Sequence, residues 1–342
     1  MRGSHTARLA AGLVWVAAAL AQPEHLRIGE IEFYGYSGID LAKKRAALPV
    51  HEGEDVSEDQ MEGLIGRIKQ ATQATAVTAV CCDDKHGLMI YLGLAGRSSR
   101  DMPYNPAPKG TGRLAPVAGE LERQFSDALT RAMGKGETGE DQSKGYALSE
   151  NAELRARQMA MRKFALSHGS EIRRVLARSS DTAQRAIAAH LTGYARQSAE
   201  QIAALVRASR DPDDEVRNVV TRGLWVLAAS SPKTAARIPA AGFIEMLSSR
   251  QWTDRNKSSL LLEVLTRSRD AKLLGELRER ALDPLIEIAR WRSKGHALAG
   301  RMMLGRCAGI EEGRLAQLVE AGDIEPILEA LRHAAIPGET PL

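Results

Sequence analysis

A helical pattern that occurs twice between residues 181 and 227 constrains the fold more than any other feature of this sequence. The first copy is Asp181-Thr-Ala-Gln-Arg185-Ala-Ile-Ala-Ala-His-Leu191, and the second is Asp213-Asp-Glu-Val-Arg217-Asn-Val-Val-Thr-Arg-Gly-Leu224. In both copies an Asp precedes an Arg by four residues, and an apolar helix face follows. Helices of this kind cannot bury an apolar face alone, so they must stack on neighbouring copies. The pattern predicts a helical repeat array that provides a surface and not a catalytic site.

Residues 147–336, which contain both copies, read as helix almost throughout. Proline interrupts the pattern at Pro212, Pro232 and Pro284. Because proline lacks a backbone N–H, it cannot continue a helix, although a first helical turn tolerates it. A third pair of anchors is predicted at Asp254 and Lys257. The anchors recur at intervals near the lower end of the ~40–47 residues of many two-helix repeats.

The stretch Asp211-Pro-Asp-Asp-Glu-Val-Arg217, followed by Leu224, resembles the short type of HEAT repeat, which also occurs in phycobilisome lyases. The resemblance covers more than half of the chain and implies an α-α superhelix, or solenoid, of about four or five helix pairs. In such repeats the Asp caps a helix and the Arg braces the loop of a neighbouring repeat. The resemblance therefore implies structural roles for the anchors Asp181, Arg185, Asp213, Arg217, Asp254 and Lys257.

Residues 26–95 follow a different pattern, which predicts a small α/β domain. Apolar residues from Ile28 to Phe33 lie close to strand alternation, and a short helix is expected after them. Ser57-x-x-Gln60 is a capping box before a second helix. Residues 76–82 and 88–94 predict two further strands joined by a turn. The predicted order of elements is β-α-α-β-β.

Three segments of this domain resemble a POTRA domain, the small periplasmic module found before outer-membrane barrels and in some division proteins. They are Ile28-Gly-Glu-Ile-Glu-Phe-Tyr-Gly35, Leu48-Pro-Val-His-Glu-Gly53 and Gly87-Leu-Met-Ile-Tyr-Leu92. The resemblance implies a strand edge that docks extended peptides by β-augmentation. Because no barrel pattern follows, the role in outer-membrane protein assembly does not carry over. A generic α/β module is the alternative.

The segment of residues 96–146 is predicted to be a linker with one helix. Pro103, Pro106 and Pro108 favour an extended chain, and the apolar spacing of residues 120–133 favours a helix. Gly134-Lys-Gly-Glu-Thr-Gly139 matches the glycine pattern of dinucleotide-binding loops. Such a loop must leave a strand and enter a helix, whereas this one follows a predicted helix, so the match is attributed to chance.

Residues 1–21 have the layout of a secretory signal peptide. Arg2 and Arg8 precede an apolar run, and Ala19-Leu-Ala21 fits the small-x-small cleavage rule. The run is shorter than the ~20 residues of a membrane span, so cleavage near Ala21 is favoured over anchoring. The mature chain is therefore predicted to be exported, periplasmic or secreted, without a transmembrane span. An uncleaved anchor and the remnant of an expression tag are the alternatives.

Composition excludes several classes of protein. A hydrophobic content of 44% with 26% charged residues is that of a globular chain and rules out wholesale disorder. The net charge of +4 is too small and too dispersed to predict a nucleic-acid partner. Of three cysteines, the adjacent Cys81 and Cys82 are expected on a strand as unlinked small residues, because neighbouring cysteines bridge only with strain. Cys307 is expected in the core.

No catalytic, cofactor-binding or metal-binding motif is present in the sequence. His168 and His190 could meet across adjacent repeats, but each is better explained as a helix-end or partly exposed polar residue. Three tryptophans recur along the predicted array and are expected to pack between repeats, or to serve as exposed binding anchors: Trp225, Trp252 and Trp291.

The sequence therefore predicts a non-enzymatic scaffold for protein–protein interaction, of mainly α class, without cofactors and with a partner that the residues do not name. Binding is expected on the solenoid face and at the strand edge of the POTRA-like domain. Two alternatives stay open: a lyase- or isomerase-like enzyme built on HEAT repeats, and a structural envelope protein with no client.

Overall fold

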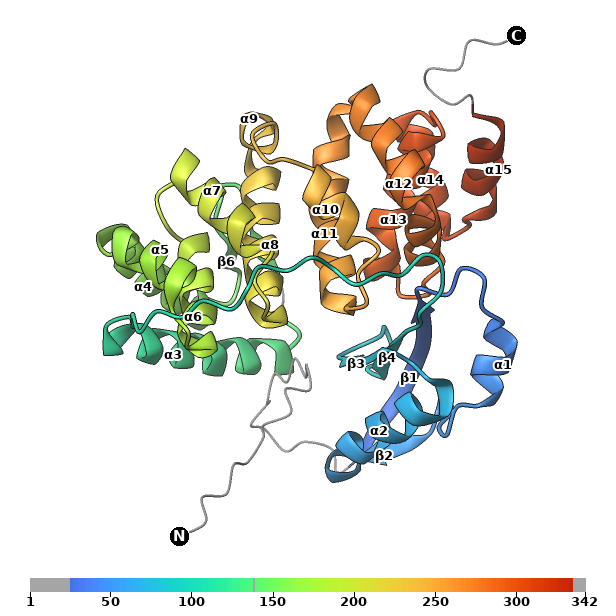
Figure 1. The fold of residues 1–342 in the computed structure, drawn as a ribbon, viewed down its shortest axis with the longest axis horizontal. Helices are drawn as coiled ribbons and strands as arrows, with labels where there is room; N and C mark the ends of the chain where they lie inside the picture. The colour runs from blue at the N-terminus through green and yellow to red at the C-terminus, as the bar shows by residue number, and fades with distance from the viewer. Residues whose placement is uncertain (1–24, 138, 335–342) are drawn as a thin grey trace.

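The computed structural model describes residues 25–137 and 139–334, which form a mainly helical protein with a small four-stranded sheet near the N-terminus (Figure 1). The predicted signal peptide, residues 1–21, lies outside the described residues. None of the described helices is long and apolar enough to cross a membrane.

Residues 25–94 form the α/β module. Its elements, in chain order, are β1 (His25–Tyr34), α1 (Leu41–Ala46), β2 (Asp55–Ser57), the 3-10 turn η1 (Glu58–Gln60), α2 (Met61–Thr72), β3 (Ala76–Val80) and β4 (Leu88–Gly93). The order along the sheet is β2-β1-β4-β3, in which β1 and β4 are parallel and the other pairs are antiparallel. Every predicted element is present, and the short strand β2 is an addition that the sequence pattern did not indicate.

Successive side chains of a strand point to opposite sides of the sheet. In this sheet, residues on both sides are buried. One face forms an apolar core with α2, to which Phe33 and Leu92 contribute. The opposite face carries Tyr34, Met89 and Tyr91, which belong to the core of the helical part of the chain. The module is therefore packed against the helices through this second face of the sheet.

Residues 116–334 form the helical part. Its helices are α3 (Pro116–Gly134), α4 (Ala152–Ser167), α5 (Gly169–Arg178), α6 (Thr182–Gly193), α7 (Ala199–Ala208), α8 (Asp214–Ser230), α9 (Pro232–Ala235), α10 (Ala241–Met246), α11 (Trp252–Leu265), α12 (Ala271–Ala289), α13 (Lys294–Cys307), α14 (Glu312–Ala321) and α15 (Glu325–His333), with a 3-10 turn η2 (Thr266–Ser268). A hairpin of β5 (Glu140–Asp141) and β6 (Leu148–Ser149) follows α3.

The starts of α6 and α8 agree with the capping residues in the sequence, whereas the predicted capping box at Ser57 and Gln60 is wrong, because Ser57 lies in β2 and α2 begins at Met61 without a side-chain cap. The side chain of Asp181 accepts a hydrogen bond from the backbone N–H of Gln184, and that of Asp213 accepts one from Val216. Pro232 lies in the first turn of α9, as predicted. Pro284 lies within α12, but the chain kinks at Ala281 just before it, so the predicted interruption is a kink and not a helix end.

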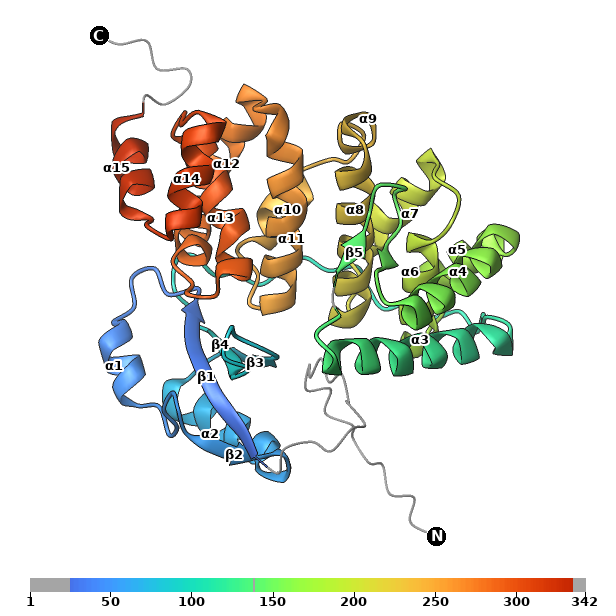
Figure 2. The same cartoon turned by 180° about the vertical axis from the view of Figure 1, so that it is seen from behind.

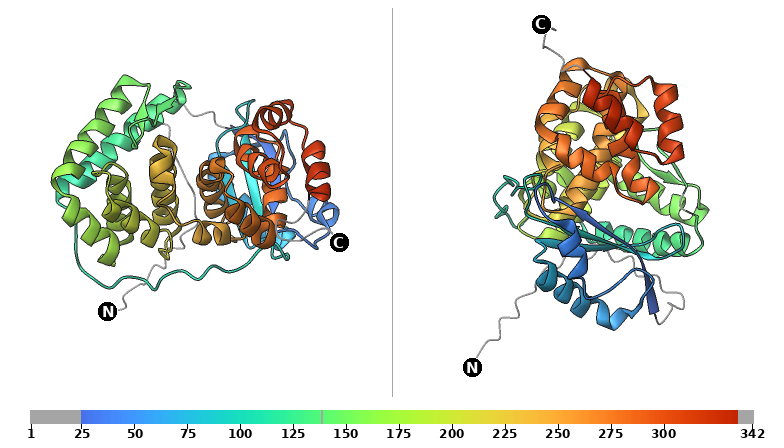
Figure 3. Two further views of the ribbon diagram at one scale, coloured as in Figure 1. Left: turned by 90° about the horizontal axis from the view of Figure 1, so that it is seen from above. Right: turned by 90° about the vertical axis from the view of Figure 1, so that its right-hand side faces the viewer.

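The segment of residues 95–115, named here the strap, connects the α/β module to α3. It is extended, as its prolines predict, and it runs along the outer edge of the helical part from the sheet to the far end (Figure 3). Its backbone is hydrogen-bonded to the helical part at several points. The predicted linker is therefore a bound segment and not a free spacer.

Cys81 and Cys82 are joined by a disulfide in the turn after β3. The expectation of two unlinked residues on a strand is wrong on both points, because β3 ends at Val80 and the chain turns there. Cys307 is a free, buried cysteine at the end of α13, as predicted.

Candidate functional site

A buried arginine stands at the fourth position of α6, and it joins two loops. The guanidinium of Arg185 donates from Nη1 to the backbone oxygen of Ser179, six residues earlier, at 3.0 Å. Its Nε and Nη2 each donate to the carboxylate of Asp211 at 2.9 Å. Because Asp211 lies in the loop before α8, Arg185 ties the start of one helix to the start of the next. Both side chains are buried.

The same arrangement recurs at the fourth position of α8. Arg217 donates from Nη1 to the backbone oxygen of Asp211, again six residues earlier, at 2.8 Å. Its Nε donates to the carboxylate of Asp254, on α11, at 2.8 Å. The ring of Tyr104 stacks on this guanidinium with 3.8 Å between Cζ and the ring centre, and its hydroxyl donates to Asp254 at 2.6 Å. The predicted bracing of neighbouring loops by Arg185 and Arg217 therefore has a direct geometric basis.

The third arginine of this kind is Arg255, the fourth residue of α11, and not the predicted anchor Lys257. Arg255 donates from Nε to the backbone oxygen of Ser249 at 2.7 Å and pairs with Glu287 at 3.1 Å. Spacing from Asp254 indicated Lys257, but Asp254 is the buried acceptor of Arg217 and does not cap α11, whose cap residue is Gln251. Arg255 is identified by the contact it shares with Arg185 and Arg217, a hydrogen bond from the guanidinium to the backbone oxygen six residues earlier.

The strap crosses the three loops that these arginines organise. A backbone N–H of the strap donates to a backbone oxygen in each loop, and the donors recur every five residues along the strap. The pairs are Arg100 to Ser248 at 2.9 Å, Asn105 to Arg210 at 2.6 Å and Gly110 to Arg178 at 2.8 Å. In each loop, the residue that accepts from the strap directly precedes the residue whose backbone oxygen accepts from Arg185, Arg217 or Arg255. The chain itself therefore occupies the edge formed by these loops.

The loop before α13 is covered by β1 of the α/β module. The indole Nε1 of Trp291 donates to the backbone oxygen of Phe33 at 3.2 Å, and Arg292 pairs with Glu32 at 2.7 Å. Trp252 and Trp291 both contact the ring of Tyr91 at this junction and are buried there. Their indoles are enclosed between the module and the helices, so neither is an exposed binding anchor.

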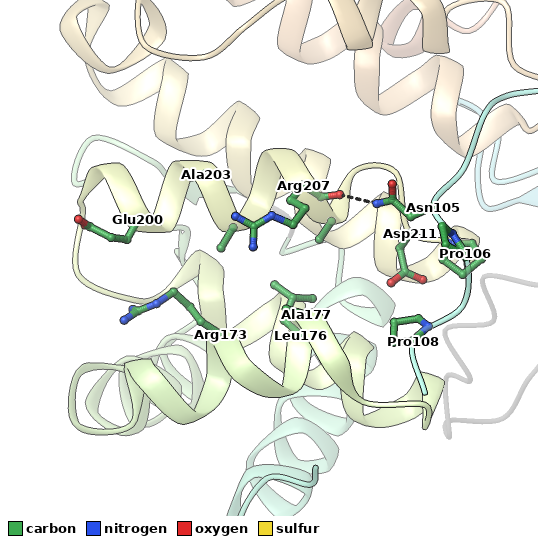
Figure 4. A pocket seen from close by; sticks show the side chains of 13 residues that line it. Asn105, Pro106, Pro108, Arg173, Leu176, Ala177, Glu200, Ala203, Arg207 and Asp211 are labelled. Atoms are coloured by element: carbon green, nitrogen blue, oxygen red, sulfur yellow. Dashed lines mark hydrogen bonds between the residues drawn. The ribbon is translucent and has the colours of Figure 1, made fainter. Parts of the chain in front are cut away.

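An outer groove lies between α5 and α7, with a volume of about 560 Å³ (Figure 4). Four alanines line it, together with Arg173 and Arg207, which point into it from the two helices. The strap closes one end with Pro106 and Pro108. Asp211 lines this groove with its carboxylate engaged by Arg185, and the other ionisable residues of the lining are Glu200, Arg173 and Arg207.

A second cavity, the inner cleft, lies on the side of the helices away from the strap. It has a volume of about 520 Å³ and is lined by residues of α3, α4, α6, α8, α11 and the β5–β6 hairpin. Figure 2 shows β5 on the face of the helical part that is turned away in Figure 1, where the strap is in front. The apolar walls of the inner cleft are Phe125, Leu129 and Met133 on α3 and Val219 and Val226 on α8. A cavity of this size with apolar walls is in the range of ligand-binding sites.

Two ion pairs lie on the walls of the inner cleft. His190 Nδ1 approaches the carboxylate of Glu122 at 2.9 Å, and the ring of Phe125 meets the imidazole edge-on. Arg222 donates from Nη2 to both carboxylate oxygens of Glu140 at 2.6 and 2.7 Å. His190 lies in the last turn of α6, as expected, and contacts Glu122 of α3, whereas His168 caps the end of α4 and stacks on Phe164.

Lys257 is the cation of the cleft that has no ion pair or hydrogen bond within residues 25–137 and 139–334. Its side chain is partly buried on α11. Burial and the neighbouring charge of Arg222 lower the pKa of the Lys257 ammonium to about 8, although Glu215 and Glu140 oppose this shift. A lysine with a lowered pKa in a cleft is typical of functional sites. The sequence predicted a structural role for this residue and missed its position in the cleft.

The described residues contain no cluster of His, Cys, Asp or Glu that could hold a metal ion. Trp225, the remaining predicted anchor, is partly exposed on α8 and packs against the helical core. No protein-family model matches the sequence, and no curated protein matches it at a significant level. The inner cleft is therefore identified by its geometry alone.

Proposed function

We propose that this protein is a non-enzymatic scaffold that binds a protein partner in the inner cleft. In this proposal the helical part is a HEAT-like solenoid, the α/β module is POTRA-like, and the chain works in the cell envelope after export. The observation that carries the proposal is the occupation of one whole edge by the strap and β1, while the inner cleft stays open.

Rigidity supports this proposal. The arginines Arg185, Arg217 and Arg255 link the helix-start loops in series, and the strap adds a second connection at the same loops. A site on a rigid frame loses little conformational entropy on binding, so more of the contact energy appears as affinity. A frame of this kind suits recognition of a partner better than a flexible array would.

The edge strand β3 supports a second contact in the same role. It pairs only with β4 among the described strands, so its other edge has no strand partner and could take an added strand. The strand is short, from Ala76 to Val80, and is bounded by the turn that contains the disulfide. Addition of a strand at this edge is the binding mode expected of a POTRA-like module.

Site-specific photocrosslinking in envelope extract tests the proposal. A photoreactive phenylalanine analogue at Leu129 probes the cleft, one at Val77 probes the β3 edge, and one at Ala203 in the outer groove is the control. We expect a discrete crosslinked protein from the Leu129 position and none from Ala203. Crosslinks that are identical at all three positions, or absent from Leu129, would contradict binding in the cleft.

A further inference from the structure

We infer that the outer groove between α5 and α7 binds a small aliphatic dicarboxylate, whose two carboxylates pair with Arg173 on one wall and Arg207 on the other. The inference goes beyond the proposed function, because it concerns a different cavity of the helical part and a different class of ligand. It is carried by two guanidinium groups that point into one cavity and have no partner among the described residues.

The two cations of the groove are the first part of the argument. Arg173 and Arg207 point into the space between α5 and α7 (Figure 4). Within residues 25–137 and 139–334, neither guanidinium has an ion pair, a hydrogen bond or a ring contact. By contrast, the nearby Arg185 is held by the buried carboxylate of Asp211. A guanidinium presents a planar set of N–H donors that matches a carboxylate, so two of them on facing walls define a site for an anionic ligand.

The acidic groups of the groove do not neutralise these two cations. Asp211 is paired with Arg185, and Glu200 lies at the end of the groove away from the strap (Figure 4). The pKa of the Glu200 carboxyl is lowered first by a hydrogen bond from the Ser198 side chain, and the charge of Arg173 contributes less. The groove therefore keeps an excess of positive charge, which an anionic ligand balances.

The rest of the lining fits a short aliphatic body. It consists mainly of Leu176 and four alanines, namely Ala177, Ala203, Ala204 and Ala208. Small side chains leave room for a ligand to approach the backbone of both helices. The volume of about 560 Å³ is in the range of small-molecule sites. A ligand with an apolar body and an anionic group at each end therefore matches the groove.

The dimensions of the groove favour a small molecule over a protein chain. Helices α5 and α7 have ten residues each, so the walls extend for about 15 Å. The strap closes one end with Pro106 and Pro108. It is fixed there, because the side chain of Asn105 donates to the backbone oxygen of Arg207 at 3.2 Å. An extended peptide cannot pass this closed end, whereas a short diacid fits in front of it.

A second cavity with alanine walls shows what distinguishes the outer groove. It has a volume of about 510 Å³, is lined by residues of α8, α9, α11 and α12, and contains one arginine, Arg267. The guanidinium of Arg267 is paired with Glu263 at 2.8 Å, and the one carboxylate of the lining, Asp270, caps α12. Alanine walls therefore occur here beside a cation that is already paired. The outer groove differs in its two arginines, which no group in the described part of the chain pairs.

Titration calorimetry of the full chain with a series of diacids tests this inference. The probes are malonate, succinate, glutarate and adipate, with butyrate as a monoacid and inorganic phosphate as a compact anion. We expect one diacid to bind roughly tenfold more tightly than butyrate, because only a diacid makes a charge-assisted contact with both walls. Equal affinity of the diacids and butyrate would overturn the inference. So would the absence of diacid binding, or tighter binding of phosphate than of every diacid.

Arg173→Met and Arg207→Met each remove one guanidinium and keep an unbranched side chain. Each variant is expected to bind the best diacid no more tightly than butyrate. Arg174→Met changes an exposed arginine of α5 that does not line the groove, so it is the matched control. Both groove variants should melt at the wild-type temperature, because no described group depends on either guanidinium, and this separates lost binding from lost folding. Undiminished diacid binding in either variant would overturn the inference.

NMR of the alanine methyl groups locates the bound diacid. The methyl resonances of Ala203 and Ala204 are expected to shift, whereas those of Ala235 and Ala236 in the second cavity should not. Shifts that are absent from the outer groove, or equal in both cavities, would contradict the assigned site. A small diacid is not a protein and leaves the inner cleft free, so the photocrosslinking test at Leu129 can succeed or fail independently of this one.

Discussion

The carboxylate of Glu287 accepts a hydrogen bond of 2.6 Å from the backbone N–H of Gly35, although 252 residues separate them in the chain. The same carboxylate accepts from the N–H groups of Tyr36 and Ser37 and pairs with Arg255. Gly35 has φ +70°, and an added Cβ would lie 2.4 Å from the backbone oxygen of Leu94. The last arginine of the series is therefore connected, through Glu287, to the turn that ends β1.

Glu287→Gln is expected to lower the free energy of unfolding by about 3–5 kcal/mol. The amide keeps the size of the side chain but removes the charge that compensates buried Arg255, and it replaces one acceptor oxygen with a donor. Urea denaturation measures the change. Glu279→Gln, at an exposed position of the same helix, is the control and should shift the midpoint little. Equal stability of both variants would show that Glu287 does not connect the two parts.

Gly110→Ala is expected to loosen the strap at its last crossing. A Cβ at this position would lie 2.5 Å from the backbone oxygen of Arg178, the atom to which Gly110 N–H donates. Faster hydrogen exchange and proteolysis between residues 105 and 115 would report the loosening. At Gly112 the nearest atom would be the Val175 Cγ2 at 3.9 Å, so Gly112→Ala is the matched control. If the two variants exchange alike, the strap is not held at Gly110.

Stability is expected to fall as the pH drops from about 6.5 toward 4, in part because of His296. Burial, with a smaller contribution from Lys257, lowers the pKa of this imidazole to about 4, while Tyr91 hydroxyl lies 2.6 Å from its Nδ1. Between about pH 6.5 and 4, His296 therefore binds a proton in the unfolded chain but not in the folded chain, so the stability present above pH 6.5 is lost as the pH falls. We expect a loss of about 1–3 kcal/mol, allowing for partial solvent access.

Urea denaturation of the variant His296→Asn at pH 7 and pH 4.5 isolates this contribution. Its stability should depend less on pH over this interval than that of the wild type. His51→Asn, at an exposed position of the α/β module, should leave the dependence unchanged. A wild-type pH profile reproduced by His296→Asn would assign the loss to other groups.

Thiol counting tests the disulfide between Cys81 and Cys82. The native protein should show no rapidly reacting thiol, because these two are linked and Cys307 is buried, with its pKa raised to about 11 by that burial. Denaturation alone should release one thiol, and denaturation with reductant should release three. Two reactive thiols in the native protein would contradict the linkage and restore the expectation of free cysteines.

The helices and strands were largely determined by local sequence. The Asp residues at 181 and 213 predicted helix starts because a side-chain cap acts within three residues, and apolar periodicity depends only on nearby positions. The repeated Asp-to-Arg spacing also led to Arg185 and Arg217 as structural residues, since a repeat preserves the same local relation. The scaffold function stays a proposal, because a surface is not encoded by a local motif.

Only the tertiary structure decided the rest. Arg255 was missed because the residue four positions before it is Gln251 and not an Asp, so it lacks the Asp-to-Arg spacing of the first two copies, and its partner Glu287 is brought to it only by folding. The prolines of the strap predicted an extended chain. Its hydrogen bonds to three loops, from donors five residues apart, depend on how the helices stack. Within the described part of the chain Lys257 has no ion pair, because neighbouring groups such as Arg222 and Glu140 already pair with each other. Burial and pairing are properties of residues brought together from distant positions, so a sequence read locally does not contain them.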